Sequence, residues 1–300
     1  MTTVQEGTVR LAMRAMATRF ELVLAGDDPV RLRAAGEEAL AEIRRLERQL
    51  SPFDPRSEVS RVNARAGREP VPVTPTLFRL LERARHLWDL TGGAFDPTVG
   101  PLMRCWGFRG GAGPIPDPEA VAQARARTGM DRVRLEDGTV AFETEGVEID
   151  PGGIGKGFAL EEAARLLREL GVPSALLHGG TSTVVAYGPA PDRRGWRVAL
   201  DEVDARPPVI VTLDGRALAV SAVHGRRVEA EGRTYGHVLD PRTGRPVAGA
   251  RLAAVVTASA TDADALATAL LVLGADGPAR LPDGTAALVD TGRTLLRHGL

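Results

Sequence analysis

Apolar residues recur at helical spacing along several stretches of the chain. The first predicted helix follows Asp28-Pro29, where an aspartate can cap the helix and a proline suits its first position. Its apolar stripe repeats every three or four residues and consists of Leu32, Ala35, Ala39, Ile43, Leu46 and Leu50. The same signals predict helices after Thr74-Pro75 up to the glycines at 92 and 93, after Asp117-Pro118, and over residues 158–170 and 261–273.

Short apolar runs bounded by turn-forming residues predict the strands. They cover residues 20–24, 147–150, 174–177, 196–200, 209–213, 217–221, 234–239 and 251–257, with two more short runs near the C-terminal end. The dipeptide Asp137-Gly138 predicts a tight hairpin between two further runs. Residues 51–67 and 94–118 are predicted as loops, and the second is long enough to suggest a functional element.

The order of these elements predicts the fold class. Strands in runs, mixed with a few helices, favour an α+β fold with a mixed, largely antiparallel sheet flanked by helices. A length of 300 residues suits either two units or one two-lobed domain. We expect a single domain over residues 1–300, with two lobes as an option.

The composition narrows the functional classes. A hydrophobic share of 43% and a charged share of 26% are ordinary for a globular protein with a sizeable core. A net charge of −1 without Lys/Arg-rich runs disfavours nucleic-acid binding, so small molecules or proteins are the expected partners. Cys105 is the only cysteine, which excludes an internal disulfide and a cysteine-built metal site. Since no apolar stretch has the length of a signal-peptide core or a membrane helix, we expect a cytoplasmic protein without a membrane segment.

A glycine-rich turn, EIDPGGIGKGF at residues 148–158, joins a predicted strand to a predicted helix. That arrangement can point backbone N–H groups at phosphate oxygens. Lys156 lies in this turn and is the only lysine of the chain, and Asn63 is the only asparagine. The turn is neither a Walker A loop nor a G-x-G-x-x-G motif, because Asp150, Gly157 and Phe158 stand at positions where those motifs need other residues. A generic glycine turn therefore remains the alternative to a phosphate site.

Two further groups of polar residues are candidates for chemistry. Asp264 and Thr268 are four residues apart and share one helix face, where their oxygens suit Mg²⁺. The alternatives are a capping box from Thr261 to Asp264, a bond from Thr268 back to the preceding turn, and solvated aspartates at the helix start. His237 precedes a tight turn and is either a structural residue or a general base.

Six sequence blocks in order resemble the ApbE family of flavin transferases, which move FMN from FAD onto a threonine of a target protein. The blocks are MATRF from residue 16, LSPFDPRSEVSRVN at 50–63, TGGAFDPTVGPL at 91–102, EIDPGGIGKGF at 148–158, HVLDPRTGRPV at 237–247 and ADALATALLVLG at 263–274. The resemblance implies an ApbE-like, T-fold-like architecture. It also implies FAD as substrate, Mg²⁺ as cofactor and an acceptor protein as partner.

The resemblance also implies a role for each matching residue. Mg²⁺ would be bound by Asp264, Thr268 and the carbonyl group of Gly153. The residues expected along FAD are Met16, Phe53, Ala94, Phe95, Asp96, Asp150, Lys156 and Val238. Lys156 and Asp264 would be catalytic at the pyrophosphate. The reaction also needs a base for the threonine proton, for which we nominate His237.

The chain departs from the family pattern at four positions. Alanine replaces glycine at Ala17 and at Ala222, Gly155 replaces alanine, and Thr181 replaces aspartate. The changes at Ala17 and Gly155 exchange one small residue for another and leave a tight turn possible. Those at Thr181 and Ala222 bear on how the nucleotide or the acceptor threonine is seated. Two other activities therefore stay open, a metal-dependent FAD pyrophosphatase and an FAD-binding protein without catalysis.

Overall fold

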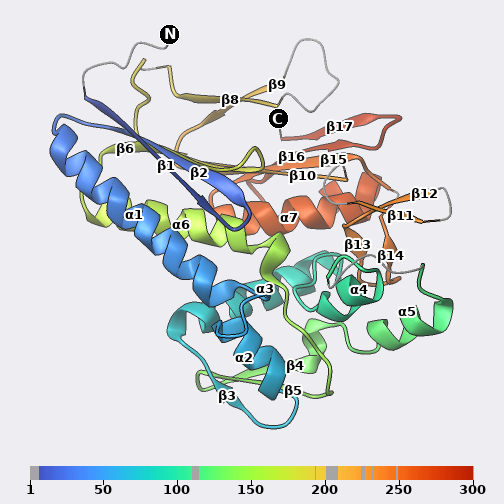
Figure 1. Ribbon diagram of the computed structural model, residues 1–300. Helices are drawn as coiled ribbons and strands as arrows, with labels where there is room; N and C mark the ends of the chain where they lie inside the picture. Colours follow the sequence, from blue (N-terminus) through green and yellow to red (C-terminus); the bar gives the residue numbers. More distant parts are fainter. Residues whose placement is uncertain are drawn as a thin grey trace.

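The computed structural model describes residues 7–109, 115–192, 194–200, 209–223, 227–230, 233–247 and 249–299. Its centre is an eight-stranded sheet (Figure 1). In spatial order the strands are β1 (Thr8–Ala15), β2 (Thr18–Ala25), β6 (Ser174–Gly179), β7 (Thr183–Tyr187), β10 (Arg216–Ala222), β15 (Leu252–Thr257), β16 (Ala286–Asp290) and β17 (Leu295–His298). Each pairing between these neighbours is antiparallel. The predicted α+β class with a largely antiparallel sheet is confirmed.

Three helices cover one face of this sheet, namely α1 (Pro29–Leu50), α6 (Gly155–Glu169) and α7 (Ala260–Leu273) (Figure 1). The carboxylate of Asp28 accepts hydrogen bonds from the first turn of α1, as its sequence predicts. The apolar stripe of α1 is buried, whereas α7 is apolar on nearly all sides. Helix α7 is buried all round because it contacts the sheet, α6 and α3 (Pro75–Thr91).

A hairpin of β8 (Trp196–Leu200) and β9 (Val209–Leu213) lies above the opposite face of the sheet in Figure 1. Trp196 and Leu213 of this hairpin belong to one buried apolar cluster with Leu218 and Leu288 of the sheet. Apolar side chains are thus buried on both faces of the sheet.

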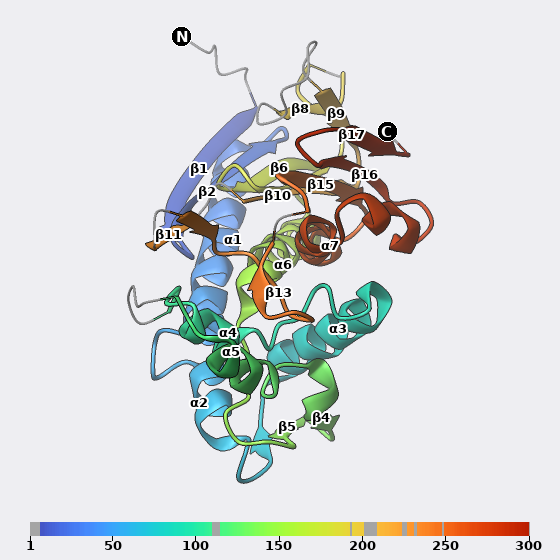
Figure 2. The same cartoon turned by 90° about the vertical axis from the view of Figure 1, so that its right-hand side faces the viewer.

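The remaining elements lie on the far side of the three helices from the sheet (Figures 1 and 2). They are α2 (Glu58–Arg65), α3, α4 (Gly100–Cys105), α5 (Pro118–Arg125) and a small sheet of β3 (Val71–Pro72), β5 (Thr139–Phe142) and β4 (Val133–Glu136). Two short hairpins complete the fold, β11 (Arg227–Ala230) with β12 (Arg233–Gly236) and β13 (Leu239–Asp240) with β14 (Arg245–Pro246). Within the described ranges no helix is long and apolar enough to cross a bilayer. The domain count and the cytoplasmic location stay predictions.

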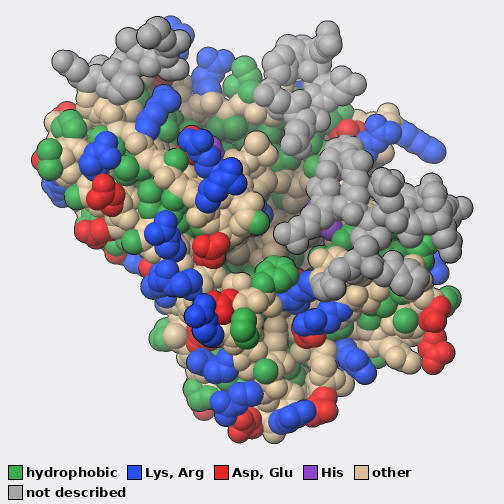
Figure 3. All heavy atoms as spheres, in the orientation of Figure 1, with side chains coloured by type: hydrophobic (Ala, Val, Ile, Leu, Met, Phe, Trp, Pro, Cys, Tyr) green, Lys and Arg blue, Asp and Glu red, His purple; other side chains and the backbone are tan. Residues whose placement is uncertain are grey.

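Arg side chains are interspersed with Asp and Glu on the face shown in Figure 3. Some arginines form ion pairs along a helix, such as Arg45 with Glu42 at 2.6 Å on α1. Arg165 likewise pairs with Glu169 at 2.6 Å on α6. Such exposed pairs stabilise a helix only slightly.

Several predicted elements differ from the structure. The predicted loop over residues 51–67 contains α2, whose N-terminus is capped by the hydroxyl of Ser57, and the predicted loop over 94–118 contains α4. Within that loop, residues 110–114 lie outside the described residues. The predicted strand over 234–239 is two separate strands, β12 and β13, and the predictions omitted β1 and β7.

The predicted strand over residues 147–150 is also wrong, because this segment makes only one isolated bridge, from Glu148 to Val99. The amide side chain of Asn63 takes the place of a partner strand. Its Nδ2 donates to the carbonyl oxygen of Ile149 at 2.9 Å, and the N–H of Ile149 donates to its Oδ1 at 2.8 Å. The only asparagine of the chain therefore holds the segment that leads into the glycine turn.

Replacement of Asn63 by alanine is expected to lower the free energy of unfolding by about 1–3 kcal/mol, because two polar groups of the buried residue Ile149 lose their partner. Urea unfolding measures this change. Gln123→Ala is a matched control, since it removes an exposed side-chain hydrogen bond to Glu119. An Asn63→Ala variant as stable as that control would contradict the proposed role of the amide.

Candidate functional site

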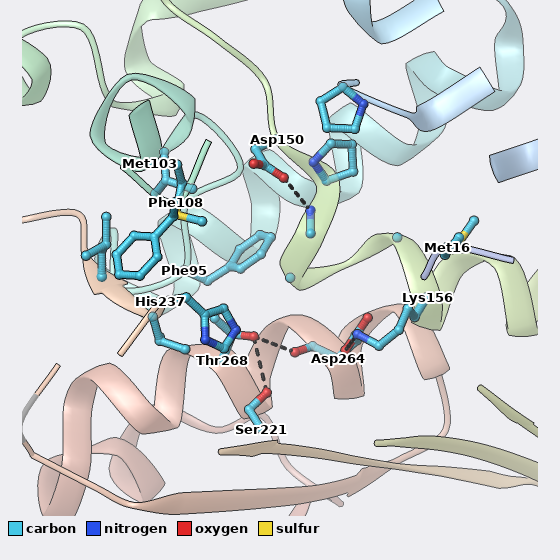
Figure 4. A pocket seen from close by; sticks show the side chains of 18 of the residues that line it. Met16, Phe95, Met103, Phe108, Asp150, Lys156, Ser221, His237, Asp264 and Thr268 are labelled. Atoms are coloured by element: carbon cyan, nitrogen blue, oxygen red, sulfur yellow. Dashed lines mark hydrogen bonds and ion pairs between the residues drawn. The ribbon is translucent and has the colours of Figure 1, made fainter. Parts of the chain in front are cut away.

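A cavity of about 760 Å³ is lined by residues of α6, α7 and β10 and by segments on the far side of the helices. All residues predicted to form the site line this one cavity (Figure 4). They are Met16, Phe53, Ala94, Phe95, Asp96, Asp150, Gly153, Lys156, His237, Val238, Asp264 and Thr268. Their individual roles stay predictions.

One wall of the cavity is the junction between α6 and α7. The N–H of Gly157 donates to Oδ2 of Asp264 at 3.0 Å, and Nζ of Lys156 lies 3.4 Å from Oδ1 of the same carboxylate. Asp264 is 2% exposed, and its charge is stabilised by this ammonium group and by the N-terminus of α6. A Cβ atom at Gly157 would overlap the carbonyl oxygen of Ala260. Glycine at position 157 therefore permits the two helices to approach this closely.

The start of α7 differs from the capping-box alternative. Ser259 is the N-cap and accepts a hydrogen bond from the N–H of Asp262 at 3.1 Å. Glu161 of α6 accepts further hydrogen bonds from the hydroxyl of Ser259 at 2.6 Å and from the N–H of Thr261 at 2.9 Å. Ser259 and Glu161 thus cap two of the orphan N–H groups of this helix, and Asp264 bonds instead to the N–H of Gly157 on α6.

A second part of the same wall is formed by hydroxyl groups. Thr268 donates to the carbonyl oxygen of Asp264 at 3.1 Å, and its Oγ1 lies 3.4 Å from Oγ of Ser221 (Figure 4). The glycine turn packs against this hydroxyl, since a Cβ atom at Gly153 would lie 3.3 Å from Oγ1 of Thr268. Among the residues that the structure describes, no three His, Cys, Asp or Glu side chains form a metal cluster. A carboxylate, a hydroxyl and a nearby backbone carbonyl are a donor set that fits Mg²⁺, which keeps waters and binds substrate phosphates.

Another part of the cavity is apolar and aromatic. Phe95 is buried and lies against the glycine turn, because a Cβ atom at Gly153 would be 3.5 Å from its ring. Phe108 and Met103 also line this part (Figure 4), and Phe53 is 65% exposed. Aromatic faces of this kind suit a flat ring system.

The turn between β1 and β2 forms another edge of the cavity. Met16 and Ala17 both have positive φ angles, 48° and 59°, which is uncommon for residues other than glycine. The N–H of Met16 donates to Oε1 of Glu47 on α1 at 2.5 Å. This bond fixes the turn against the helix and places Met16 at the cavity.

Asp96 is buried at the base of the segment that carries Phe95. Burial raises the pKa of its carboxyl to about 6, although three donated hydrogen bonds favour the charged form. The donors are Nε1 of Trp88 at 2.9 Å and the N–H and hydroxyl of Thr98 at 2.8 and 2.5 Å. These hydrogen bonds order the turn around Asp96.

His237 precedes β13, and its ring lines the cavity together with Val238 (Figure 4). Residues Gly152 and Gly153 of the glycine turn line the same cavity. The turn that carries His237 and the glycine turn therefore contribute to the same cavity, which a role of His237 as general base requires. The assignment of that role stays a prediction.

Some cavity residues were not predicted as site residues. They include Glu47, Met103, Phe108, Arg109 and Ser221. Phe108 and Arg109 fall in the long segment predicted to be functional, but nothing in the sequence singles them out. Of the positions that depart from the family pattern, 17, 155 and 222 line the cavity, whereas Thr181 is exposed and is not among the lining residues.

Comparisons with known proteins agree with this geometry. The model of the ApbE family matches residues 16–289. A protein of Treponema pallidum named FAD:protein FMN transferase is 32% identical over 80% of this chain and 72% of its own length. The structure of an ApbE protein from Thermotoga maritima superposes with a TM-score of 0.88 at 29% identity over 97% of both chains. The apo structure of the Pseudomonas stutzeri flavinyl transferase ApbE superposes with a TM-score of 0.86 at 29% identity, over 99% of this chain and 96% of the Pseudomonas chain. The chain therefore belongs to the ApbE family.

Proposed function

We propose that this protein transfers FMN from FAD to a threonine hydroxyl of an acceptor protein and releases AMP in a Mg²⁺-dependent reaction. The proposal is supported by the family and by relatives named FAD:protein FMN transferase. The observation that carries it is one cavity that joins an aromatic wall to the cluster of Lys156, Asp264 and Thr268. FAD has the matching chemistry, a flat ring at one end and a pyrophosphate in its middle.

The reaction exchanges one P–O bond for another. The threonine oxygen bonds to the phosphorus of the FMN half while the bond from that phosphorus to the bridging oxygen breaks. AMP leaves with the bridging oxygen, and the threonine proton goes to a base. Phosphoryl transfer of this kind needs positioning and positive charge at the phosphate oxygens. Nζ of Lys156 supplies a cation at this wall, and its side chain is 24% exposed toward the cavity.

The residues of the wall fit a divalent ion at the pyrophosphate. Asp264, Thr268 and the carbonyl of Gly153 would hold Mg²⁺, which when bound neutralises charge on the phosphate oxygens. The N–H of Gly157 binds Oδ2 of Asp264 and so fixes the direction of the carboxylate. Thr268 is fixed by its bond to the preceding turn and by Ser221.

His237 is the proposed base for the threonine proton. Its imidazole is at the cavity, and histidine is the side chain that most often transfers protons in enzymes. A hydroxyl group placed between this ring and the pyrophosphate would lose its proton as its oxygen bonds to phosphorus.

One assay separates the proposed function from its alternatives. The protein is incubated with FAD and Mg²⁺, with and without a candidate acceptor that carries a threonine, and AMP release and acceptor mass are followed. AMP released only together with an FMN-sized mass increase supports the transferase. AMP and free FMN without acceptor would indicate a pyrophosphatase, and FAD binding without any AMP would indicate a binding protein. Either of these results would contradict the proposal.

A further inference from the structure

Arg109 is a buried arginine at the aromatic part of the cavity. It follows α4, and its side chain is only 4% exposed although it is one of the lining residues. A buried guanidinium group is tolerated only with charged or hydrogen-bonding partners. The partners of Arg109 come from two segments that are far apart in the sequence.

The first segment carries Phe53. Nη2 of Arg109 donates to the carbonyl oxygen of Pro52 at 3.0 Å, and the guanidinium carbon lies 5.2 Å from the centre of the Phe53 ring. Phe53 is 65% exposed, so little packing by the protein fixes its ring. A cation at this distance attracts the face of the ring, and the bond to Pro52 holds the backbone beside it. Arg109 therefore restrains both the ring and its backbone.

The second segment is the approach to the glycine turn. Nη1 of Arg109 donates to Oε2 of Glu148 at 3.2 Å, and its Nε lies 3.8 Å from Oδ2 of Asp150. Asp150 in turn accepts a hydrogen bond from the N–H of Gly152 at 2.9 Å. One guanidinium group thus connects the segment that carries Phe53 to the segment that enters the glycine turn.

We propose that Arg109 is a positioning residue that holds Phe53 as a wall for the flavin ring and so sets the affinity for the flavin half of FAD. This inference rests on the proposed function. Two of the donor nitrogens of Arg109 are already bonded to protein oxygens, and its Nε faces Asp150. The guanidinium group of Arg109 therefore acts through Phe53. The cation available to a phosphate is Lys156, at the junction of α6 and α7.

The test measures ligand affinity, which does not depend on transfer. In R109Q, the dissociation constants of FAD and FMN are expected to rise by about 5- to 30-fold, from the loss of a desolvated cation–π contact. The dissociation constant of AMP is expected to stay within about twofold, because AMP lacks the flavin ring. R109K retains the cation without the planar fork and is expected to recover part of the affinity for FMN. R109K also keeps the test valid if R109Q fails to fold, because it conserves the positive charge beside Glu148.

R104Q is the matched control. Arg104 pairs with the same Glu148 at 2.7 Å, but its side chain is 59% exposed and it does not line the cavity. Its loss is expected to leave all of these dissociation constants unchanged. The inference would be overturned if R109Q lost as much affinity for AMP as for FMN, or if R109Q and R104Q lost the same affinity for FMN.

A double-mutant cycle with Phe53 tests whether Arg109 acts through the ring. F53L alone is expected to weaken FMN binding. R109Q added to F53L is expected to weaken it little further, because the effects of substitutions at two residues in contact are not additive. Additive losses would contradict the proposed route through Phe53. A wild-type protein that binds neither FAD nor FMN would contradict the proposed function itself, whereas normal flavin binding by R109Q would contradict only the inference.

Discussion

Replacement of Asp264 by asparagine is expected to reduce Mg²⁺-dependent release of AMP from FAD by roughly 10²–10³-fold, the loss typical when one electrostatic group of a polar site is removed. Asparagine has nearly the same volume, and its side-chain oxygen can still accept the N–H of Gly157, so the fold is preserved. The variant lacks the negative charge that faces Lys156 at 3.4 Å and that a divalent ion requires. AMP release is measured over a range of Mg²⁺ concentrations with saturating FAD.

Asp262 provides the control for this change. It lies two residues before Asp264, in the first turn of α7, but it pairs with Arg83 and does not line the cavity. Asp262→Asn is expected to retain AMP release and its Mg²⁺ dependence. Calorimetric titration with Mg²⁺ in the absence of FAD gives a second readout, in which only Asp264→Asn should lose binding. Wild-type turnover and normal Mg²⁺ dependence in Asp264→Asn would exclude the metal assignment.

The second large effect is expected for Gly157→Ala, which should lower the free energy of unfolding by about 3 kcal/mol or more through overpacking. The added Cβ atom would overlap the carbonyl oxygen of Ala260 and lie 2.8 Å from Cβ of Asp264. Both neighbours belong to α7, so α6 and α7 must separate. That separation breaks the bond from the N–H of Gly157 to the carboxylate, and AMP release should fall together with stability. Urea unfolding and the AMP assay measure the two effects.

Gly155→Ala is the matched substitution in the same helical turn. A Cβ atom there would lie 3.5 Å from Cβ of Pro151, an ordinary contact. The φ angle of Gly155 is not positive, and alanine restricts the unfolded chain more than glycine, which stabilises by about 0.4–1 kcal/mol at such a position. This variant should therefore be as stable as the wild type or more stable. Equal stability of the two alanine variants would show that the approach of α6 to α7 does not depend on position 157.

The sequence predicts best those elements whose signals are local. Asp28, Thr74 and Asp117 cap α1, α3 and α5, where each was expected. The hairpin turn at Asp137-Gly138 forms between β4 and β5, with positive φ at both residues. These features depend on hydrogen bonds and steric limits within a few residues, which adjacent side chains determine.

Elements that depend on distant partners could not be predicted in this way. The segment before the glycine turn is held by the side chain of Asn63, 86 residues earlier in the chain. The residues of the site were found because they lie in recognisable blocks, and the structure brings those blocks to one cavity. Arg109 was missed because its contact with Pro52 spans 57 residues, and no local pattern encodes that pairing.

The order of strands in the sheet has a consequence for synthesis of the protein on the ribosome. Strand β2 pairs with β6, about 150 residues later, and the cavity combines the turn at Met16 with Thr268 of α7. Contacts this distant in sequence form late and slowly. A nascent chain is therefore expected to bind FAD, the proposed substrate, only after α7 has left the exit tunnel. Flavin fluorescence of stalled chains of increasing length should change only after that point.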